Sequence, residues 1–204
     1  MSMAVVPRMR DKKSGNKTWL PPSRWKLVQA SVPIVCVDVL PIRTSRLAPH
    51  TVEAIGLILR DTPRQGQRWC LIGGRLLYGE PLQDAIVRQV GETLGRRVRV
   101  HRRRDQQPLY IAQYAPHSIR PFALDPRQHA VGLTYVSEMT GSPAPQGEAV
   151  AYEWFDVRKL PPPEEFGFDQ DRVVKFCLQL LRTATPSNTR AGRTRRRKTI
   201  VKSP

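Results

Sequence analysis

Three charged residues, Asp84, Arg88 and Glu92, follow one another at intervals of four in the 204-residue sequence. On a helix, this spacing places their side chains along one face. Carboxylates bind hard divalent cations, and a guanidinium pairs with a phosphate or with a neighbouring carboxylate. The pattern therefore indicates a helix that presents charged groups to a metal–phosphate complex.

The segment around these residues has the signals of a glycine-led loop followed by such a helix. Pro81 suits the first turn, where its missing N–H costs nothing, and Gly95 suits the left-handed C-cap. Gly91 lies inside the helix at a cost of about 1 kcal/mol relative to alanine, and close approach by a neighbouring element is the one reason for it that the sequence leaves open. The apolar face of the helix comprises Leu82, Ala85, Ile86, Val90 and Leu94.

The stretch from Gly73 to Gly95 resembles the Nudix box, G-x5-E-x7-R-E-U-x-E-E-x-G-U, in which U is aliphatic. The matching positions are Gly74, Glu80, Arg88, Val90, Glu92 and Gly95. The resemblance implies that Glu92 binds a divalent metal ion. It implies a structural role in the loop and helix for Gly74, Glu80, Arg88 and Gly95.

Departures from the box affect its metal-binding face. Gln89 and Thr93 stand where the family has two further glutamates, and Arg96 stands where it has an aliphatic residue. Only Glu92 remains of the three glutamates that hold metal ions in the family. The resemblance therefore implies the Nudix fold, with Mg²⁺ or Mn²⁺ as cofactor and with chemistry that depends on groups outside the box.

Within that family the sequence is most similar to the GDP-mannose mannosyl hydrolases, which also have a degenerate box. The similarity places Asp38 at a position linked to catalysis. Arg60 and Arg75 fall where two arginines stabilise the diphosphate. The backbone carbonyl of Gly73 falls at a metal-binding position, and Glu148 stands where those hydrolases have a metal-ligating glutamine.

Two functions remain open. The first is a metal-dependent hydrolase of a nucleoside diphosphate linked to another group, such as a sugar, with metal ligands from Gly73, Glu92 and Glu148. The second is a Nudix-like nucleotide-binding or regulatory module without turnover. Ala149, at the position of a catalytic histidine, favours the second function, and His129 is a substitute base only by its expected proximity.

Asp38 interrupts Val32–Leu40, an apolar and β-branched segment that predicts a strand buried on both faces. Burying a lone carboxylate is costly unless the group is paired or functional. Two alternatives follow: a carboxylate that faces solvent near the end of the strand, or a buried carboxylate with a function.

The predicted elements alternate as strands, helix, strands and helix, which gives an α/β/α sandwich with a mixed sheet between helices. The Nudix resemblance implies the same fold for a domain of residues 27–186. A short helix capped by Ser23 precedes the first strand. The remaining strands are expected at 52–59, 68–72, 96–104, 109–114, 130–139 and 148–157. The last helix is expected at 169–182, with Val173, Val174, Phe176, Cys177, Leu180 and Leu181 inside.

The net charge of +17 is concentrated at the two ends of the chain. Residues 1–26 carry +6 and residues 187–204 carry +7, which leaves +4 for residues 27–186. These ends are poor in apolar residues, so we expect a flexible basic arm and a disordered basic tail. Such tails attract polyanions, so non-specific nucleic acid is one partner to test, and a solvated tail without a partner is the alternative.

The apolar runs and the cysteines of the sequence indicate in which cellular compartment the protein is expected. No run of about 18 apolar residues occurs and the N-terminus lacks an apolar signal-peptide core, so we expect a cytoplasmic protein without a membrane partner. Cys36, Cys70 and Cys177 are too widely spaced for a C-x-x-C site, and reduced thiols are expected. A homodimer is one oligomeric state that the sequence leaves open.

Overall fold

The computed structural model describes residues 20–48, 51–101, 107–116 and 123–183. Most of the predicted basic arm and all of the predicted basic tail lie outside these residues.

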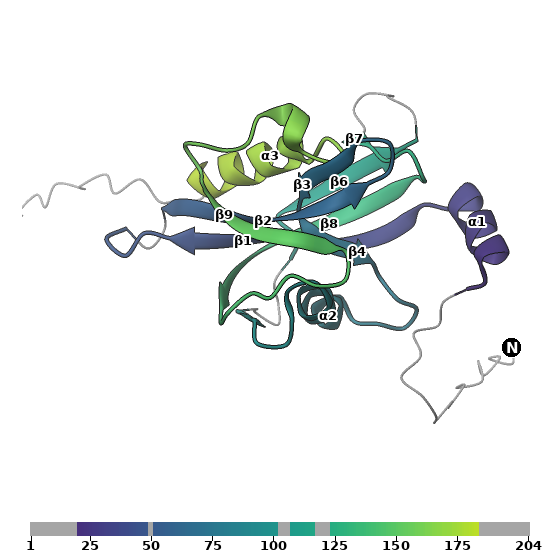
Figure 1. The fold of residues 1–204 in the computed structure, drawn as a ribbon, viewed down its shortest axis with the longest axis horizontal. Helices are drawn as coiled ribbons and strands as arrows, with labels where there is room; N and C mark the ends of the chain where they lie inside the picture. Colours follow the sequence, from purple (N-terminus) through teal and green to yellow (C-terminus); the bar gives the residue numbers. More distant parts are fainter. Residues whose placement is uncertain (1–19, 49–50, 102–106, 117–122, 184–204) are drawn as a thin grey trace, which may run out of the picture.

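In the described part of the chain, a mixed sheet of nine strands forms the centre of the fold (Figure 1). The strands are β1 (Ile34–Thr44), β2 (Val52–Thr62), β3 (Gly66–Cys70), β4 (Ile72–Arg75), β5 (Arg99–Val100), β6 (Tyr110–Ala115), β7 (Ala123–Leu124), β8 (Ala130–Thr140) and β9 (Ala149–Asp156). Their main order is β3-β2-β1-β8-β6-β7, and β4, β5 and β9 pair with β1, β8 and β2. The β1–β8 and β6–β7 pairs are parallel and the others are antiparallel.

Among the described residues, three α-helices accompany the sheet: α1 (Pro22–Ser31), α2 (Leu82–Leu94) and α3 (Gln170–Thr183). A 3₁₀ turn, Pro163–Glu165, precedes α3. Figure 1 shows α2 and α3 on opposite faces of the sheet and α1 at one end of it, beside the start of β1. This arrangement confirms the predicted α/β fold with a mixed sheet between helices.

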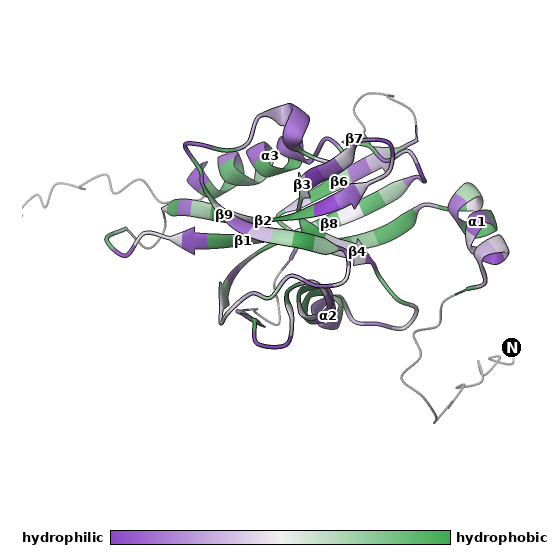
Figure 2. Ribbon diagram, in the orientation of Figure 1, coloured by the Kyte–Doolittle hydropathy of each residue, from purple (hydrophilic) through white to green (hydrophobic). Residues whose placement is uncertain are grey.

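β1 passes through the core, as its run of β-branched residues predicts. Val37, Val39 and Leu40 have no exposed surface because β1 has strands on both sides and helices over both faces. Figure 2 shows hydrophobic residues concentrated in these central strands and on α2 and α3. Burial of this apolar surface is the main force that fixes the position of β1.

Gly73 and Gly74 lie in strand β4 and not in the predicted loop. β4 pairs antiparallel with β1, so Gly73 lies opposite Asp38. The sequence reading placed the loop too early because two adjacent glycines normally mark a turn. Here they instead allow close packing against a neighbouring strand.

The strand predicted at 96–104 is wrong in length. Only Arg99–Val100 pairs, with β8 as partner, and residues 102–106 lie outside the described residues. A turn follows Gly95, whose φ of +84° favours glycine. This turn uses residues that the alternating pattern had assigned to a strand.

The expectations about Ser23, Phe176 and Leu180 are also wrong. Ser23 does not cap α1, because the helix begins at Pro22 after Pro21 in the cap position. Phe176 and Leu180 of α3 are 49% and 40% exposed, and Leu178 is buried in their place. The segment before β9 does approach Gly91, because Gln146 Nε2 donates to its carbonyl at 3.1 Å, but a Cβ there would meet no atom of the described chain outside its helix within 4 Å.

None of the described helices has both the length and the apolar character needed to cross a membrane. Cys36, Cys70 and Cys177 are free thiols, and the last two are buried.

Candidate functional site

The Asp38 carboxylate lies between two glycines on the strands that flank β1. A Cβ at Gly132 of β8 would stand 2.5 Å from Oδ2, and a Cβ at Gly73 of β4 would collide with Oδ1. The two glycines therefore provide the space that the carboxylate occupies. Asp38 is 6% exposed and lies in the middle of β1, so the solvent-facing alternative is wrong.

This carboxylate lines a cavity of about 60 Å³ between the sheet and the start of α3. Four residues that the sequence indicated meet here, Asp38, Arg60, Gly73 and Gly74. The other lining residues are Cys36, Cys70, Leu71, Tyr114, Asp125, Arg127, Gln128, Ala130, Phe168 and Gln170. The cavity is thus built from segments that are far apart in the sequence.

Burial raises the pKa of Asp38 to about 7, because the ionised carboxylate loses its hydration. The nearby Arg60 guanidinium lowers this pKa and the Glu148 carboxylate raises it. A carboxyl group that titrates near neutral pH can both accept and release a proton under physiological conditions. Asp38 therefore has the protonation behaviour required of a general base.

Arg60 connects the cavity to the segment before β9. Its Nη2 lies 2.7 Å from Oε2 of Glu148. The strand pairing produces this contact, because Arg60 of β2 stands opposite Ala149, the first residue of β9. Burial raises the pKa of Glu148, while Arg60 and Arg127 lower it and Glu92 raises it.

Phe168 lies close to two arginines of the cavity. The guanidinium carbon of Arg127 is 4.9 Å from the centre of its ring, and that of Arg60 is 5.9 Å away. Phe168 and Asp169 have φ values of +58° and +53°, a left-handed conformation that costs non-glycine residues free energy. The fold keeps this strained turn at the place where it sets an aromatic ring beside two cations.

Asp125 fixes the orientation of Arg127. Its Oδ1 accepts hydrogen bonds from Nε of Arg127 at 2.9 Å and from the backbone N–H at 3.0 Å. Its Oδ2 accepts a third from Nη2 at 2.9 Å. The Asp-Pro-Arg sequence is a turn signal that could have pointed to this pair. We find no local signal for Phe168, which sequence reasoning also missed.

Glu80 and Arg88 tie the loop after β4 to α2. Arg88 Nε is 2.6 Å from Glu80 Oε1 and Nη2 is 2.7 Å from Oε2. Glu80 Oε2 also accepts the Leu77 N–H, and Arg88 Nη2 also donates to the carbonyl of Arg75. The bonds from Arg88 lower the pKa of Glu80. Arg88 Nη1 lies 3.3 Å from Oε2 of Glu92, so the same guanidinium orients Glu92.

The two positions that lack the family's glutamates are buried. Gln89 is 8% exposed and Thr93 is 3% exposed. The Gln89 amide packs against Gly74 and donates to the Arg75 carbonyl at 3.4 Å. Both residues therefore serve as neutral packing on the inner side of α2, and Glu92 is the carboxylate that α2 offers in this region.

Glu92 and Glu148 approach each other from two segments. The loop before β9 is bonded to the end of α2, because Gln146 N–H donates to the Thr93 carbonyl and Ala144 N–H to the Leu94 carbonyl. Two carboxylates with phosphate oxygens and water form a typical Mg²⁺ environment. Within the described residues, no cluster of three His, Cys, Asp or Glu side chains could hold a metal ion. A bound ion would therefore need ligands from the backbone, water or substrate.

Several predicted residues lie outside the cavity lining. Arg75 extends from the end of β4, and its guanidinium lies over the ring of Trp25 at 4.3 Å. Gly95 ends α2, and His129 precedes β8, where its carbonyl accepts the Ile34 N–H. His129 does not line the cavity, so its position gives no support for a role as base.

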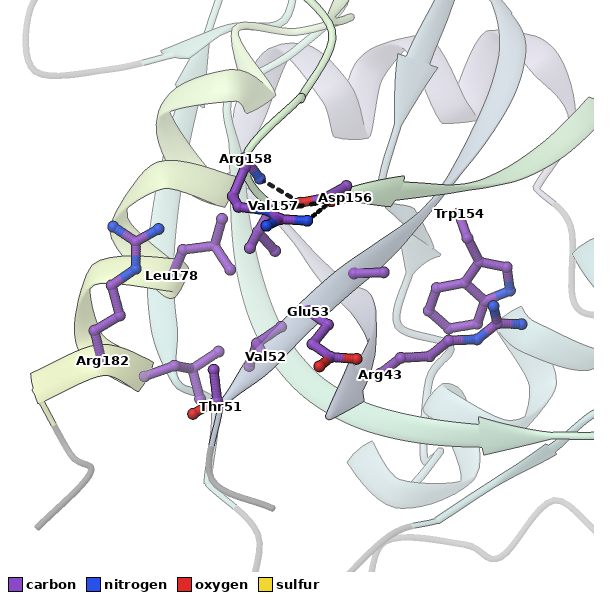
Figure 3. Close-up of a pocket in the computed structure, with 12 residues that line it drawn as sticks. Arg43, Thr51, Val52, Glu53, Trp154, Asp156, Val157, Arg158, Leu178 and Arg182 are labelled. Atoms are coloured by element: carbon purple, nitrogen blue, oxygen red, sulfur yellow. Dashed lines mark hydrogen bonds and ion pairs between the residues drawn. The ribbon is translucent and has the colours of Figure 1, made fainter. Parts of the chain in front are cut away.

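A larger groove of about 930 Å³ lies at the opposite end of β2 and β9, beside α3 (Figure 3). Arg43 lies over the Trp154 ring at 4.0 Å, and Arg158 pairs with Asp156 at 2.6 Å. None of the residues that the sequence indicated lines this groove. Its size alone therefore does not make it the centre of the chemistry.

Comparison with known proteins assigns the chain to a family. The model of the Domain of unknown function (DUF4916) matches residues 15–181. The chain belongs to the DUF4916 family. The matched residues of the DUF4916 chain include all nine strands and the whole of α1. No curated protein matches it.

Solved structures with the same fold include proteins described as Nudix hydrolases or Nudix domains. A possible asymmetric diadenosine tetraphosphate hydrolase from Jonesia denitrificans is 28% identical, with a TM-score of 0.67 over 74% of this chain and 96% of that chain. A MutT Nudix hydrolase from Burkholderia pseudomallei is 22% identical, with a TM-score of 0.54 over 74% of this chain and 98% of that chain. The Nudix domain of NrtR from Shewanella oneidensis, complexed with ADP ribose, is 15% identical, with a TM-score of 0.52 over 79% of this chain and 99% of that chain.

These likenesses confirm the Nudix fold for the DUF4916 chain. The finer resemblance to GDP-mannose mannosyl hydrolases stays a prediction.

Proposed function

We propose that this DUF4916 protein hydrolyses a nucleoside diphosphate linked to another group, such as a nucleotide sugar, with Mg²⁺ or Mn²⁺. The observation that carries the proposal is the meeting of Asp38, Arg60 and Gly73 around one cavity, with Glu148 paired to Arg60. Burial raises the pKa of Asp38 to about 7, which suits a general base at neutral pH, and the nearby Arg60 guanidinium suits a phosphate ligand.

Arg60 and Arg75 bind the diphosphate oxygens in this proposal, because a guanidinium can donate two parallel hydrogen bonds to a phosphate. Asp38 takes the proton of the attacking water, whether the water attacks phosphorus or the sugar carbon. Glu92, Glu148 and the carbonyl of Gly73 hold the metal ion. When bound, the ion neutralises the diphosphate and polarises the leaving group.

A substrate panel tests the proposal. The panel contains ADP-ribose, GDP-mannose and diadenosine tetraphosphate, the last because of the description of the Jonesia denitrificans protein, each with Mg²⁺ or Mn²⁺. We expect at least one compound to be hydrolysed by the parent protein. Glu92→Gln and Glu148→Gln should each reduce kcat/KM by at least about tenfold, and chelation of the metal should abolish turnover.

Glu53→Gln is the matched control, since Glu53 lines the larger groove away from the cavity. We expect its turnover to equal that of the parent. Turnover that survives both Glu92→Gln and Glu148→Gln would rule out the proposed metal site.

The second candidate is a nucleotide-binding module without turnover. The burial of neutral Gln89 and Thr93, at positions where active relatives have glutamates, favours it. Calorimetric binding of a panel compound without detectable hydrolysis at high enzyme concentration would support the module. Hydrolysis that responds to Glu92→Gln would exclude it.

A further inference from the structure

Helix α1 does not hold its place through a buried apolar face. None of its ten residues is buried, Leu27 is 68% exposed, and the helix starts without a side-chain cap. A helix of this length is marginal in water on its own. Its position must therefore depend on specific contacts with the rest of the fold.

Two long-range side-chain contacts join α1 to the region of the cavity, one to Arg75, which follows the lining residue Gly74, and one to a residue of the lining itself. The Trp25 ring lies under the Arg75 guanidinium at 4.3 Å. The Gln29 Nε2 donates to Oε1 of Gln128 at 2.8 Å, and Gln128 is a buried residue of the cavity lining. The helix is thus joined to the region of the cavity at two points, one on β4 and one on the segment before β8.

The contact with Trp25 orients Arg75 without neutralising its charge. An aromatic face attracts a guanidinium but, unlike a carboxylate, adds no negative charge. A guanidinium stacked on a ring keeps in-plane N–H groups that match a phosphate. Partial burial, followed by the nearby Arg88, lowers the pKa of Arg75, because the cation is less well solvated than in water.

The backbone of Arg75 is fixed separately from its side chain. Its carbonyl accepts hydrogen bonds from Arg88 Nη2 at 3.0 Å and Gln89 Nε2 at 3.4 Å, both on α2. α2 therefore sets where the Arg75 side chain begins, and Trp25 sets where its guanidinium ends.

We propose that α1 is part of the nucleotide site, with Trp25 as a positioning residue that holds the Arg75 guanidinium in place for the diphosphate. The inference rests on the proposed function, because it assigns the diphosphate to Arg75. It follows that ligand binding and docking of α1 stabilise each other.

Calorimetric titration of the full chain with ADP and with inorganic pyrophosphate, in the presence of Mg²⁺, tests this coupling. We expect Trp25→Ala to weaken ADP binding about fivefold and Trp25→Phe to retain most of the affinity, since phenylalanine keeps an aromatic face. Arg75→Ala should weaken binding further. The double variant Trp25→Ala/Arg75→Ala should bind no more weakly than Arg75→Ala, because Trp25 acts through Arg75.

Leu27→Ala is the control on the same helix, and it should bind like the parent, as Leu27 is largely exposed. Parent affinity in Trp25→Ala would overturn the inference and leave the proposed function intact. Additive losses in the double variant would overturn the positioning role by showing that Trp25 acts independently of Arg75. Failure of the parent to bind both ADP and pyrophosphate would overturn the proposed function and this inference together.

Discussion

Among single residues, Asp38 couples the stability of the fold to pH. Its pKa rises from an ordinary 3.8 to about 7 in the folded protein. The folded state therefore holds the proton more tightly than the unfolded state. The neutral carboxyl makes its full contribution to the free energy of unfolding below about pH 4. This contribution is lost as the pH rises through 7, because the buried group must then ionise.

Asp38→Asn keeps the shape of the side chain and removes the titration. We expect the stability of this variant relative to the parent to increase between about pH 4 and pH 8, by up to about 4 kcal/mol. Urea unfolding at several pH values measures the difference. A difference that does not change with pH would show that Asp38 titrates at its ordinary value.

The left-handed backbone conformation of Phe168 lowers the free energy of unfolding, and this effect can be measured separately from the contribution of its ring. Its φ of +58° is strained for any residue with a Cβ, and its side chain is buried. Phe168→Gly and Phe168→Ala both lose the buried ring, but only glycine relieves the strain. We expect the glycine variant to be more stable than the alanine variant by about 1 kcal/mol, measured by denaturant unfolding. The reverse order would contradict the left-handed conformation.

Among elements, α2 contains one residue that weakens it without a packing reason. A Cβ at Gly91 would meet no described atom outside the helix within 4 Å. We therefore expect Gly91→Ala to raise the free energy of unfolding by about 1 kcal/mol. Gly74→Ala is the contrasting substitution, since its Cβ would stand 2.8 Å from Nε2 of Gln89, and it should give no gain. Equal effects of the two substitutions would refute this account.

The elements themselves were largely predictable, because their signals are local. The apolar spacing in residues 82–94 and the β-branched run in β1 depend only on neighbouring residues. The errors arose where a partner decides the structure. Gly73 and Gly74 became a strand because β1 lies beside them, and among the described residues of 96–104 only Arg99–Val100 finds a partner strand, in β8.

On the scale of the whole molecule, the site is assembled from segments that the sequence keeps far apart. Asp38, Arg60 and Gly73 were predicted because a family resemblance covers their strands. Arg127, Phe168 and Trp25 were not, since each reaches the site through the topology of the sheet or through an added helix. The spacing of residues along the sequence gives no sign that these side chains lie close together in the folded protein.

The charge of the whole chain leads to a prediction about polyanions. Residues 187–204 carry +7, so we expect weak binding of DNA or RNA that falls steeply between about 50 and 200 mM salt and disappears when this segment is deleted. Fluorescence anisotropy with a labelled oligonucleotide measures both effects. Binding that persists after the deletion would point to other arginines, such as those of 96–104.

The side chain of Asp38 fills space that Gly73 and Gly132 leave open, so the effect of a substitution at one of these positions depends on the residues at the others. At Gly132, the atoms nearest to an added methyl group would be side-chain atoms of Asp38 and Tyr114, whereas at Gly73 the methyl group would also stand 2.6 Å from the backbone carbonyl of Val37. Gly132→Ala should therefore be rescued in thermal stability when it is combined with Asp38→Gly, and Gly73→Ala should not. Gly132→Ala is thus tolerated only after Asp38 has been replaced by a smaller residue. The order in which the two substitutions occur therefore decides whether the protein stays folded.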